Sequence, residues 1–260
     1  MAIYSLFFFI RMDSEQSSND CWKIKVYETD KNELPQTSGM KSGVIPKFPS
    51  MMLLVGKSGS GKSNLLLNMV LDPALLGDYF DEIYFISPTA DVDDLVEHLE
   101  LKKENLWSDL DKAVGDLETL MDNQAHDVER YGITKTNKVL VLVDDAVANK
   151  AFIKSDILTK LAIHGRHNLI SSIICTQSYT KVPRVIRLQA AGLALFPSSQ
   201  GEVKLLIDDY CPANTTKKAF EKIVRYATDE PYQFLFIQNH CKKMCERYRK
   251  NLGLIIDIKE

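Results

Sequence analysis

The sequence lacks a long apolar run and a strong excess of positive charge. The N-terminal apolar run Leu6–Ile10 is too short to span a bilayer, and no basic region or small-residue cleavage site accompanies it. We therefore expect no integral membrane segment and no secretory signal. The formal net charge of −3 argues against a broad face that coats nucleic acid. Any contact with DNA must come from local patches, or from several subunits around a channel.

A disulfide framework is also missing. The chain has five cysteines at irregular spacing, which are Cys21, Cys175, Cys211, Cys241 and Cys245. An odd number favours a reducing compartment, and Cys175 lies in an apolar run typical of a buried strand. His240, Cys241 and Cys245 could hold a metal, but no second ligand pair with zinc spacing follows, which disfavours zinc. The sequence contains no internal repeat and no low-complexity tract.

Composition changes along the chain predict three segments. Residues 1–47 are expected to form an arm, an edge strand at 22–27 and a linker rich in Pro and Gly. Within them, residues 1–11 precede Met12 and a polar stretch, and our hypothesis is that they come from an upstream start codon or form a disordered arm. Residues 48–240 are expected to be the main domain, and residues 241–260 a basic tail.

Apolar runs alternate with helical patterns in the main domain. The strand candidates are Met51–Val55, Glu82–Ile86, Val139–Val143, Leu169–Cys175, Gly192–Phe196 and Tyr232–Ile237. Nearly continuous apolar runs are typical of strands buried on both faces of a parallel sheet. Helical spacing marks the segments Asn64–Leu71, 105–130, Phe152–Ile163, Val203–Asp208 and Thr215–Tyr226. This alternation predicts an α/β fold, with a mostly parallel central sheet and helices on both faces.

The segment 56–63 matches the phosphate-binding pattern G-x-x-x-x-G-K-[ST] in full. Its residues are Gly56, Lys57, Ser58, Gly59, Ser60, Gly61, Lys62 and Ser63. Glycines let backbone N–H groups cradle phosphate oxygens, and the helix that follows adds its positive N-terminal end. Lys62 is expected to reach the β- and γ-phosphates, and the Ser63 hydroxyl to coordinate Mg²⁺. The predicted strand before the loop and the predicted helix after it supply the required context.

An apolar strand that ends in two carboxylates supplies a second motif. Val139–Val143 leads directly into Asp144 and Asp145. Carboxylates at the carboxyl edge of a parallel sheet lie where a phosphate-loop site needs them. We expect Asp144 to hold the Mg²⁺ and Asp145 to orient or deprotonate the attacking water, which is typical of an enzyme that hydrolyses ATP. The alternative is an ordinary strand end running into a polar turn.

Two further polar residues flank the strand candidate Leu169–Cys175. Gln177 follows it and is a candidate to contact the γ-phosphate and its water; an ordinary polar turn is the alternative. Arg166 precedes it, and could stabilise phosphate charge on a neighbouring subunit. By itself Arg166 also fits a surface arginine near a helix C-terminus. His164 and His167 are expected to cap or pack rather than to bind a metal.

In this order, the motifs resemble the FtsK–HerA superfamily of DNA-pumping ATPases. The separation of Arg166 and Gln177 matches the spacing between the arginine and the glutamine of bacterial FtsK. The similarity is greatest to the genome-packaging ATPases of large nucleocytoplasmic DNA viruses and their relatives. In those, Gly-Arg-His is followed by an apolar strand, a Gln turn and Pro-Arg-x-x-Arg, represented here by 165–167, 169–177 and 183–187. The resemblance covers roughly residues 48–240.

This resemblance implies a RecA-like ATPase core and a ring of identical subunits around double-stranded DNA. It also implies an arginine that acts across the subunit interface, with Arg166 favoured and Arg184 and Arg187 as rivals. Viral capsid or portal components are the implied partners, in the virion or the host cytoplasm. The superfamily often has Asp-Glu where this chain has Asp144-Asp145, and the shorter side chain makes the role of Asp145 less secure than that of Asp144.

The residues leave several functions open. The favoured one is an ATP-driven translocase that packages viral DNA. The alternatives are a DNA translocase or helicase with another role, a small-molecule kinase, and a nucleotide-gated scaffold of the virion. Two basic stretches are candidates for non-specific phosphate contacts, and either could equally be a solvated face. They comprise Lys181, Arg184 and Arg187, and then Lys242, Lys243, Arg247, Arg249 and Lys250.

Overall fold

The computed structural model describes residues 34–241 and 243–256. Contacts divide the chain into residues 1–34 and 35–260, and the second unit is described by itself. The expected edge strand at 22–27, residues 1–11 and Cys21 lie outside the described residues. Among the helices that are described, none combines the length and apolar character needed to cross a membrane.

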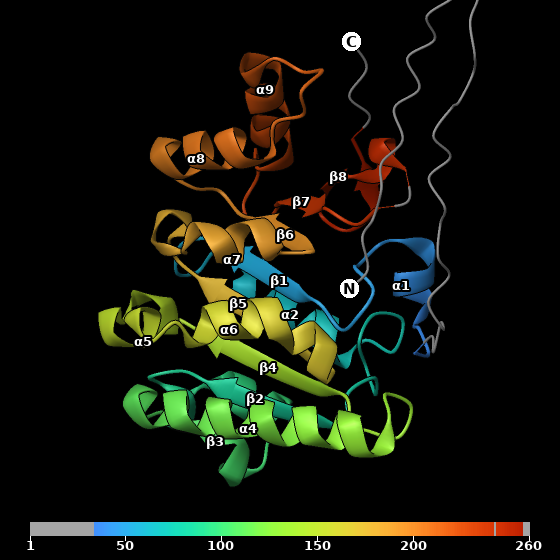
Figure 1. The fold of residues 1–260 in the computed structure, drawn as a ribbon. Coiled ribbons are helices and arrows are strands. Elements are labelled where there is room, and N and C mark those ends of the chain that lie inside the picture. Colours follow the sequence, from blue (N-terminus) through green and yellow to red (C-terminus); the bar gives the residue numbers. More distant parts are fainter. Residues whose placement is uncertain (1–33, 242, 257–260) are drawn as a thin grey trace, which may run out of the picture. The chain divides into compact units, whose positions relative to one another are not determined.

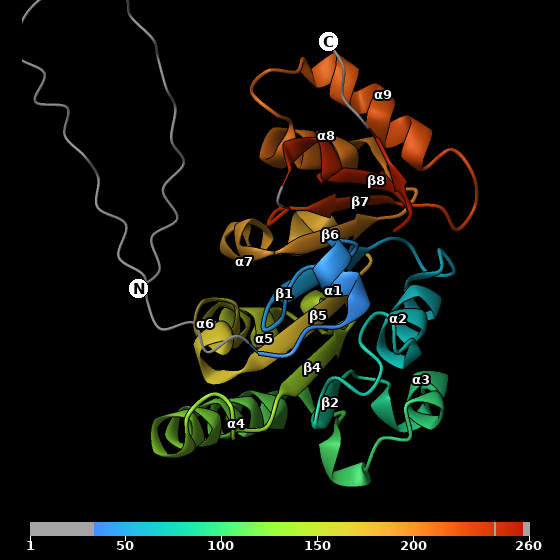
Figure 2. The same cartoon turned by 90° about the vertical axis from the view of Figure 1, so that its right-hand side faces the viewer.

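A nine-stranded sheet in the order β3-β2-β4-β5-β1-β6-β7-β8-β9 forms the centre of this unit (Figures 1 and 2). The strands from β3 to β6 in this order are parallel to one another, and β7, β8 and β9 continue the sheet in antiparallel pairings. The strands are β1 (Met51–Val55), β2 (Glu82–Ile86), β3 (Leu106–Trp107), β4 (Val139–Asp144), β5 (Ile170–Thr176), β6 (Gly192–Leu195), β7 (Leu235–Gln238), β8 (Tyr248–Lys250) and β9 (Leu254–Ile255). The predicted α/β class with a mostly parallel sheet is therefore confirmed.

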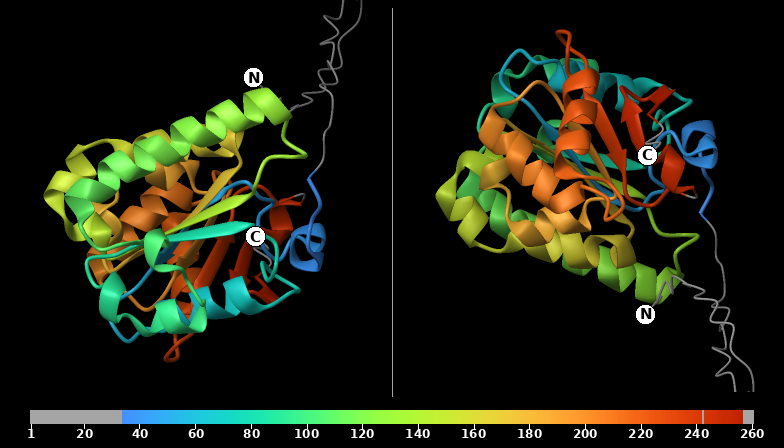
Figure 3. Two further views of the ribbon diagram at one scale, coloured as in Figure 1. Left: turned by 90° about the horizontal axis from the view of Figure 1, so that it is seen from below. Right: turned by 90° about the horizontal axis from the view of Figure 1, so that it is seen from above.

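Helices cover both faces of the sheet, as Figure 3 shows from two sides. They are α1 (Ser38–Ser42), α2 (Lys62–Leu71), α3 (Asp94–His98), α4 (Leu110–Tyr131), α5 (Lys150–Lys154), α6 (Ile157–His164), α7 (Arg184–Gln189), α8 (Gln200–Tyr210) and α9 (Lys217–Ala227). Side chains alternate between the two faces of a strand. In β1, Met52 and Leu54 belong to the core with α1, α2 and α3. Leu53 and Val55 belong to the opposite core with α4 to α9.

Several predicted elements differ in their bounds or type. The helix expected at 105–130 begins at Leu110, because residues 106–107 pair with β2 as strand β3. The helix expected at 152–163 is two helices, because Asp156 adopts a left-handed φ of 58° between them. A short helix, α1, replaces part of the expected linker, and α7 forms where no helix was predicted. Strand β7 begins at Leu235, later than expected, because residues 231–233 form a turn.

Among the described residues after 240, Tyr248–Lys250 and Leu254–Ile255 are strands of the sheet, in contrast to the basic tail expected at 241–260. Strand β8 pairs with β7, and Arg249 within it is only 4% exposed. The guanidinium of Arg249 donates to the carbonyl oxygens of Gly43 and Leu252. Lys250 donates to Asp229 at 2.8 Å, and Arg247 to Asn239 at 2.9 Å. Most of this basic stretch therefore stabilises the fold, because its charged groups are already engaged within the chain.

Candidate nucleotide-binding site

The loop Gly56–Gly61 joins β1 to α2 at the carboxyl edge of the parallel strands. The N–H of Gly56 donates to the Thr176 carbonyl at 3.1 Å, which ties the start of the loop to the end of β5. Gly61 caps α2 with a left-handed φ of 102°, and no side chain occupies the cap position. The first N–H groups of α2 are therefore available to an anion, as phosphate binding at a helix N-terminus requires.

The shape of the loop depends on its glycines. A Cβ on Gly56 would lie 2.5 Å from the Ser60 hydroxyl oxygen and 2.7 Å from Cβ of Phe196, which leaves no room for a larger residue. Gly59 has a φ of 73°, a conformation that glycine adopts without steric cost. The hydroxyl of Ser60 is buried and has no hydrogen-bond partner among the described residues. An unpaired hydroxyl inside a loop of this shape fits a ligand with acceptor oxygens.

Lys62 lies across the loop that it follows. Its side chain is buried, and Nζ donates to the carbonyl oxygens of Gly56 at 2.8 Å and Lys57 at 3.1 Å. These two bonds hold the ammonium group over the space that the loop encloses. Ser63 follows in the first turn of α2 and is exposed toward the same side. Both residues therefore lie where the sequence predicts them to act on phosphates and Mg²⁺.

The two carboxylates follow β4 and differ in their surroundings. Burial, followed by the negative charge of Asp145, raises the pKa of Asp144 to about 6. The positive charge of Lys62 acts in the opposite direction. Asp145 has a left-handed φ of 50°, which turns it away from the strand. Its carboxylate accepts a hydrogen bond from Nε2 of Gln177 at 2.7 Å. Neighbouring strands β4 and β5 thus place the two residues expected to act on water in direct contact.

A cavity of about 310 Å³ brings the predicted residues together. Its lining consists of Ser58, Gly59, Gly61, Lys62, Ser63, Asn64, Asp144, Asp145, Gln177 and Tyr232. Loop residues, one ammonium group, two carboxylates, and hydroxyl and amide side chains surround a single space. This donor set fits a magnesium-bound triphosphate, since the N–H groups and Lys62 suit phosphate oxygens and Ser63 and Asp144 suit Mg²⁺. Asn64 and Tyr232 were not among the predicted site residues.

Arg166 lies at the opposite edge of the sheet. It belongs to the 3₁₀ helix Gly165–Asn168 before β5, whereas the cavity lies after the end of β5. Because β5 has seven residues, the two ends are roughly 20 Å apart. The Arg166 side chain is exposed and close to His240, whose pKa it lowers together with desolvation. The chain therefore does not bring Arg166 to its own cavity.

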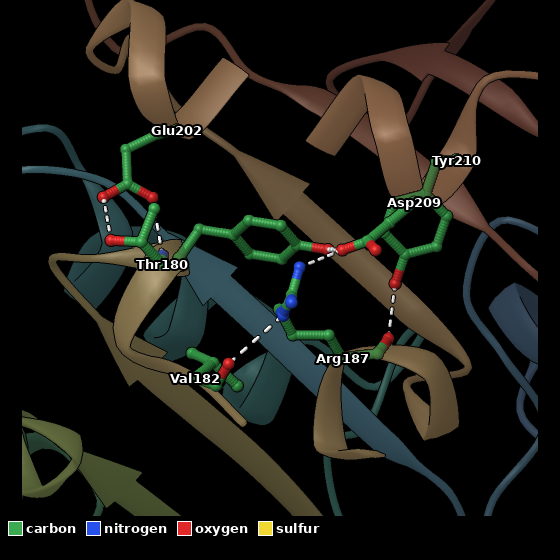
Figure 4. Close-up of polar contacts among 7 residues, drawn as sticks. Thr180, Val182, Arg187, Glu202, Asp209 and Tyr210 are labelled. Atoms are coloured by element: carbon green, nitrogen blue, oxygen red, sulfur yellow. Dashed lines mark hydrogen bonds and ion pairs between the residues drawn. The ribbon is translucent and has the colours of Figure 1, made fainter. Parts of the chain in front are cut away.

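The two rival arginines in α7 have different environments. Arg184 is exposed, but Arg187 is 7% exposed and forms an ion pair with Asp209 of α8. Figure 4 shows this contact among the polar contacts of Arg187, whose Nε donates to the Val182 carbonyl at 3.1 Å. The same Asp209 accepts from the Tyr179 hydroxyl at 2.8 Å. Arg187 is thus excluded from contact with DNA or with another subunit. This corrects two predictions for Arg187, namely that it contacts DNA phosphates and that it is a rival to Arg166 at the subunit interface.

The loop after Gln177 is held in place by hydrogen bonds to Glu202 in α8. The carboxylate of Glu202 accepts from the backbone N–H of Thr180 at 2.8 Å and from the Thr180 hydroxyl at 3.1 Å (Figure 4). It also accepts from the Ser178 hydroxyl at 2.9 Å. Because Ser178 directly follows Gln177, these bonds restrict the position of the Gln177 backbone. The sequence contains no local signal for this support, since Glu202 is 25 residues further along the chain.

Comparisons with known proteins show what this chain is similar to. The protein-family model of the poxvirus A32 protein matches residues 42–246. No curated protein matches the chain. The chain is similar to the structure of B204, the DNA-packaging ATPase from Sulfolobus turreted icosahedral virus. The two share 15% identity with a TM-score of 0.54, covering 81% of this chain and 98% of that one.

The ATPases EssC and EccC share the same fold. ATPases 2 and 3 of EssC from Geobacillus thermodenitrificans are 11% identical, with a TM-score of 0.53 and coverage of 73% of this chain and 38% of theirs. The cytoplasmic domain of EccC from Thermomonospora curvata is 15% identical, with a TM-score of 0.52 and coverage of 81% and 24%. Identities this low show a common fold, here the RecA-like P-loop ATPase fold. The predicted resemblance to viral packaging ATPases, and with it the class of enzyme, is confirmed: this chain belongs to the poxvirus A32 protein family.

Proposed function

We propose that this chain hydrolyses Mg-ATP and uses the reaction to move double-stranded DNA into a viral capsid. The observation that carries the proposal is the convergence of the phosphate loop, Asp144, Asp145 and Gln177 on one cavity. The family and the fold support the same activity. Contact between Asp145 and Gln177 favours hydrolysis, because a carboxylate paired with an amide suits a water molecule better than a bulky phosphate acceptor.

Substrate binding in this proposal rests on the loop and the residues after it. The N–H groups of the loop and of the first turn of α2 bind the phosphates, and Lys62 exchanges its bonds to Gly56 and Lys57 for bonds to phosphate oxygens. Ser63 and Asp144 are the residues that would hold Mg²⁺. When bound, Mg²⁺ would neutralise charge on the phosphates. It would also favour the ionised form of Asp144.

Hydrolysis in this proposal is directed by Asp145 and Gln177. The oxygen of a water molecule attacks the γ-phosphorus, and the bond from this phosphorus to the bridging oxygen breaks. Asp145 accepts the water proton, and the Gln177 amide fixes the orientation of that carboxylate and of the water. Because Glu202 holds the residues directly after Gln177, the amide is positioned before substrate binds.

A second subunit would complete the site. Of the described residues that line the cavity, Lys62 is the one cation, whereas the transition state spreads negative charge over several oxygens. Arg166 is exposed at the other edge of the sheet and cannot reach this cavity within one chain. A ring in which Arg166 of one subunit meets the cavity of the next would bring both together. Arg184 remains the rival, because it too is exposed.

Contact with DNA would come from the basic residues that are not engaged within the chain. Lys181 and Arg184 are exposed on neighbouring elements, whereas Lys243 before β8 pairs with Glu246 at 3.5 Å. Repeated around a ring, a few such cations can follow the phosphate backbone without reading sequence. Capsid or portal proteins are the expected further partners, in the virion or the host cytoplasm.

The proposal is tested by measuring ATP hydrolysis with and without double-stranded DNA. We expect DNA to stimulate turnover, Lys62→Ala to abolish both binding and turnover, and Arg166→Ala to abolish turnover while leaving nucleotide binding intact. Mixing Arg166→Ala with Lys62→Ala subunits should restore part of the activity if the arginine acts in trans, because some interfaces then combine an intact loop with an intact arginine. Turnover that DNA does not change, in an assembled ring, would overturn the assignment as a translocase.

A further inference from the structure

Tyr232 is an unusual residue beside the phosphate loop. It lies in the turn between α9 and β7, and its side chain is 70% exposed. Its backbone has a left-handed φ of 66°, which is unfavourable for a bulky residue. Large aromatic side chains are usually buried for most of their surface. An exposed ring on a strained backbone therefore needs an explanation, and strain of this kind often marks a ligand site.

The surrounding residues fix this turn against the loop. Two residues after Tyr232, the N–H of Phe234 donates to the Asn251 side chain at 3.1 Å. The Phe234 ring packs on Phe196 with centroids 5.0 Å apart, and Phe196 in turn lies against Gly56. On the exposed side, Cδ1 of Tyr232 lies 3.3 Å from the position of a Cβ on Gly61. The ring is thus held in contact with the phosphate loop while much of its surface stays open.

The order of the strands indicates which part of a bound ATP would lie near this ring. Asp144 and Gln177 follow β4 and β5, on one side of β1, so the γ-phosphate belongs on that side. Tyr232 precedes β7, which lies beyond β6 on the other side of β1. A triphosphate that runs along the loop between these sides directs its α-phosphate and nucleoside toward Tyr232. Asn64, in the first turn of α2, lines the cavity with it.

We propose that Tyr232 stacks against the base of the bound nucleotide. This inference rests on the proposed function, since it assumes that the loop binds ATP. An aromatic ring can stack on any nucleobase, because every base has a π-face. Tyr232 therefore contributes affinity for nucleosides over bare polyphosphate, with weak preference among bases. The stacking depends on the ring and not on the phenolic hydroxyl.

The experiment compares the affinities for ADP, ATP and inorganic tripolyphosphate by isothermal titration calorimetry, without turnover. The variants are Tyr232→Phe, which keeps the ring, and Tyr232→Asn, which removes it and tolerates the left-handed backbone. We expect Tyr232→Asn to weaken ADP and ATP roughly tenfold, as the loss of one stacked base does. Its affinity for tripolyphosphate should stay unchanged, and Tyr232→Phe should bind all three like the unaltered chain.

The controls separate this inference from the proposed function. Lys62→Ala should weaken all three ligands, and circular dichroism should show that each variant is folded. If the unaltered chain binds ATP but Tyr232→Asn does so equally well, the stacking is refuted and the proposed function stands. If Tyr232→Asn loses tripolyphosphate as strongly as ATP, Tyr232 shapes the loop and does not bind the base. If the unaltered chain binds none of the ligands, the proposed function itself fails.

Discussion

Arg184 and Arg187 lie three residues apart in α7, and replacing each with alanine should change stability by very different amounts. Arg187 and Asp209 have side chains that are 8% and 7% exposed, and they form an ion pair (Figure 4). Removing one partner of a buried pair leaves an uncompensated charge, which costs about 3–5 kcal/mol. Arg187→Ala also loses the bond to the Val182 carbonyl and the contact with the Tyr179 ring, 4.9 Å from the guanidinium carbon.

A loss of this size is a large share of the total, because domains are stable by only about 5–15 kcal/mol. We therefore expect Arg187→Ala to lower the thermal midpoint by roughly 6–20 °C. The matched control is Arg184→Ala, which should stay within about 0.5 kcal/mol of the unaltered chain because the side chain is exposed. Urea titrations followed by circular dichroism measure both free energies of unfolding.

A double replacement makes the test sharper. Arg187→Met together with Asp209→Leu removes both charges, so it should be less destabilising than Arg187→Ala, since no buried charge is left alone. If the Arg187→Ala and Arg184→Ala variants are equally stable, Arg187 is not buried. The conclusion that Arg187 cannot contact DNA would then be wrong as well. The reasoning would also be refuted if the double replacement were less stable than Arg187→Ala.

Three further results are expected at the candidate site. Asp144→Asn should raise the unfolding free energy of the nucleotide-free chain by about 3 kcal/mol at pH 8, because the pKa of Asp144 is about 6 in the folded chain and the ordinary value is 3.8. The folded state binds the extra proton between these values, so the gain should shrink as the pH falls through 6 and vanish below about 4; urea titrations across this range would contradict the argument if the gain were constant. Gly56→Ala should cost about 1–3 kcal/mol and weaken ATP binding, because its Cβ would meet Ser60 and Phe196. The control in the same melts is Gly201→Ala in α8, where a Cβ meets nothing within 4 Å, and this change should stabilise the chain by up to about 1 kcal/mol. Gln177→Ala should lower the turnover number at least tenfold with an unchanged dissociation constant for ATP, and an equal loss in binding would show that Gln177 does not act on water.

The parts of the site that depend on contiguous residues could be predicted from the sequence. The phosphate loop is one such part, because its glycines, Lys62 and Ser63 follow one another along the chain. The strand that ends in Asp144 is another, since its apolar run indicates burial on both faces of a parallel sheet. Carboxyl ends of parallel strands share one edge, so the sequence also predicted that Asp144, Asp145 and Gln177 would lie near the loop.

The fold class and the position of the phosphate loop could be predicted from periodicity and local motifs, because short stretches of sequence encode both. Which cations are available depends on packing between elements. Arg184 and Arg187 look alike in the sequence, but packing of α8 against α7 supplies Asp209 to one of them alone. Tyr232 was predicted to begin a strand, and it lies instead in a turn beside a loop about 170 residues earlier in the chain. Contacts over such separations depend on strand order and side-chain packing, and a local sequence pattern encodes neither of them.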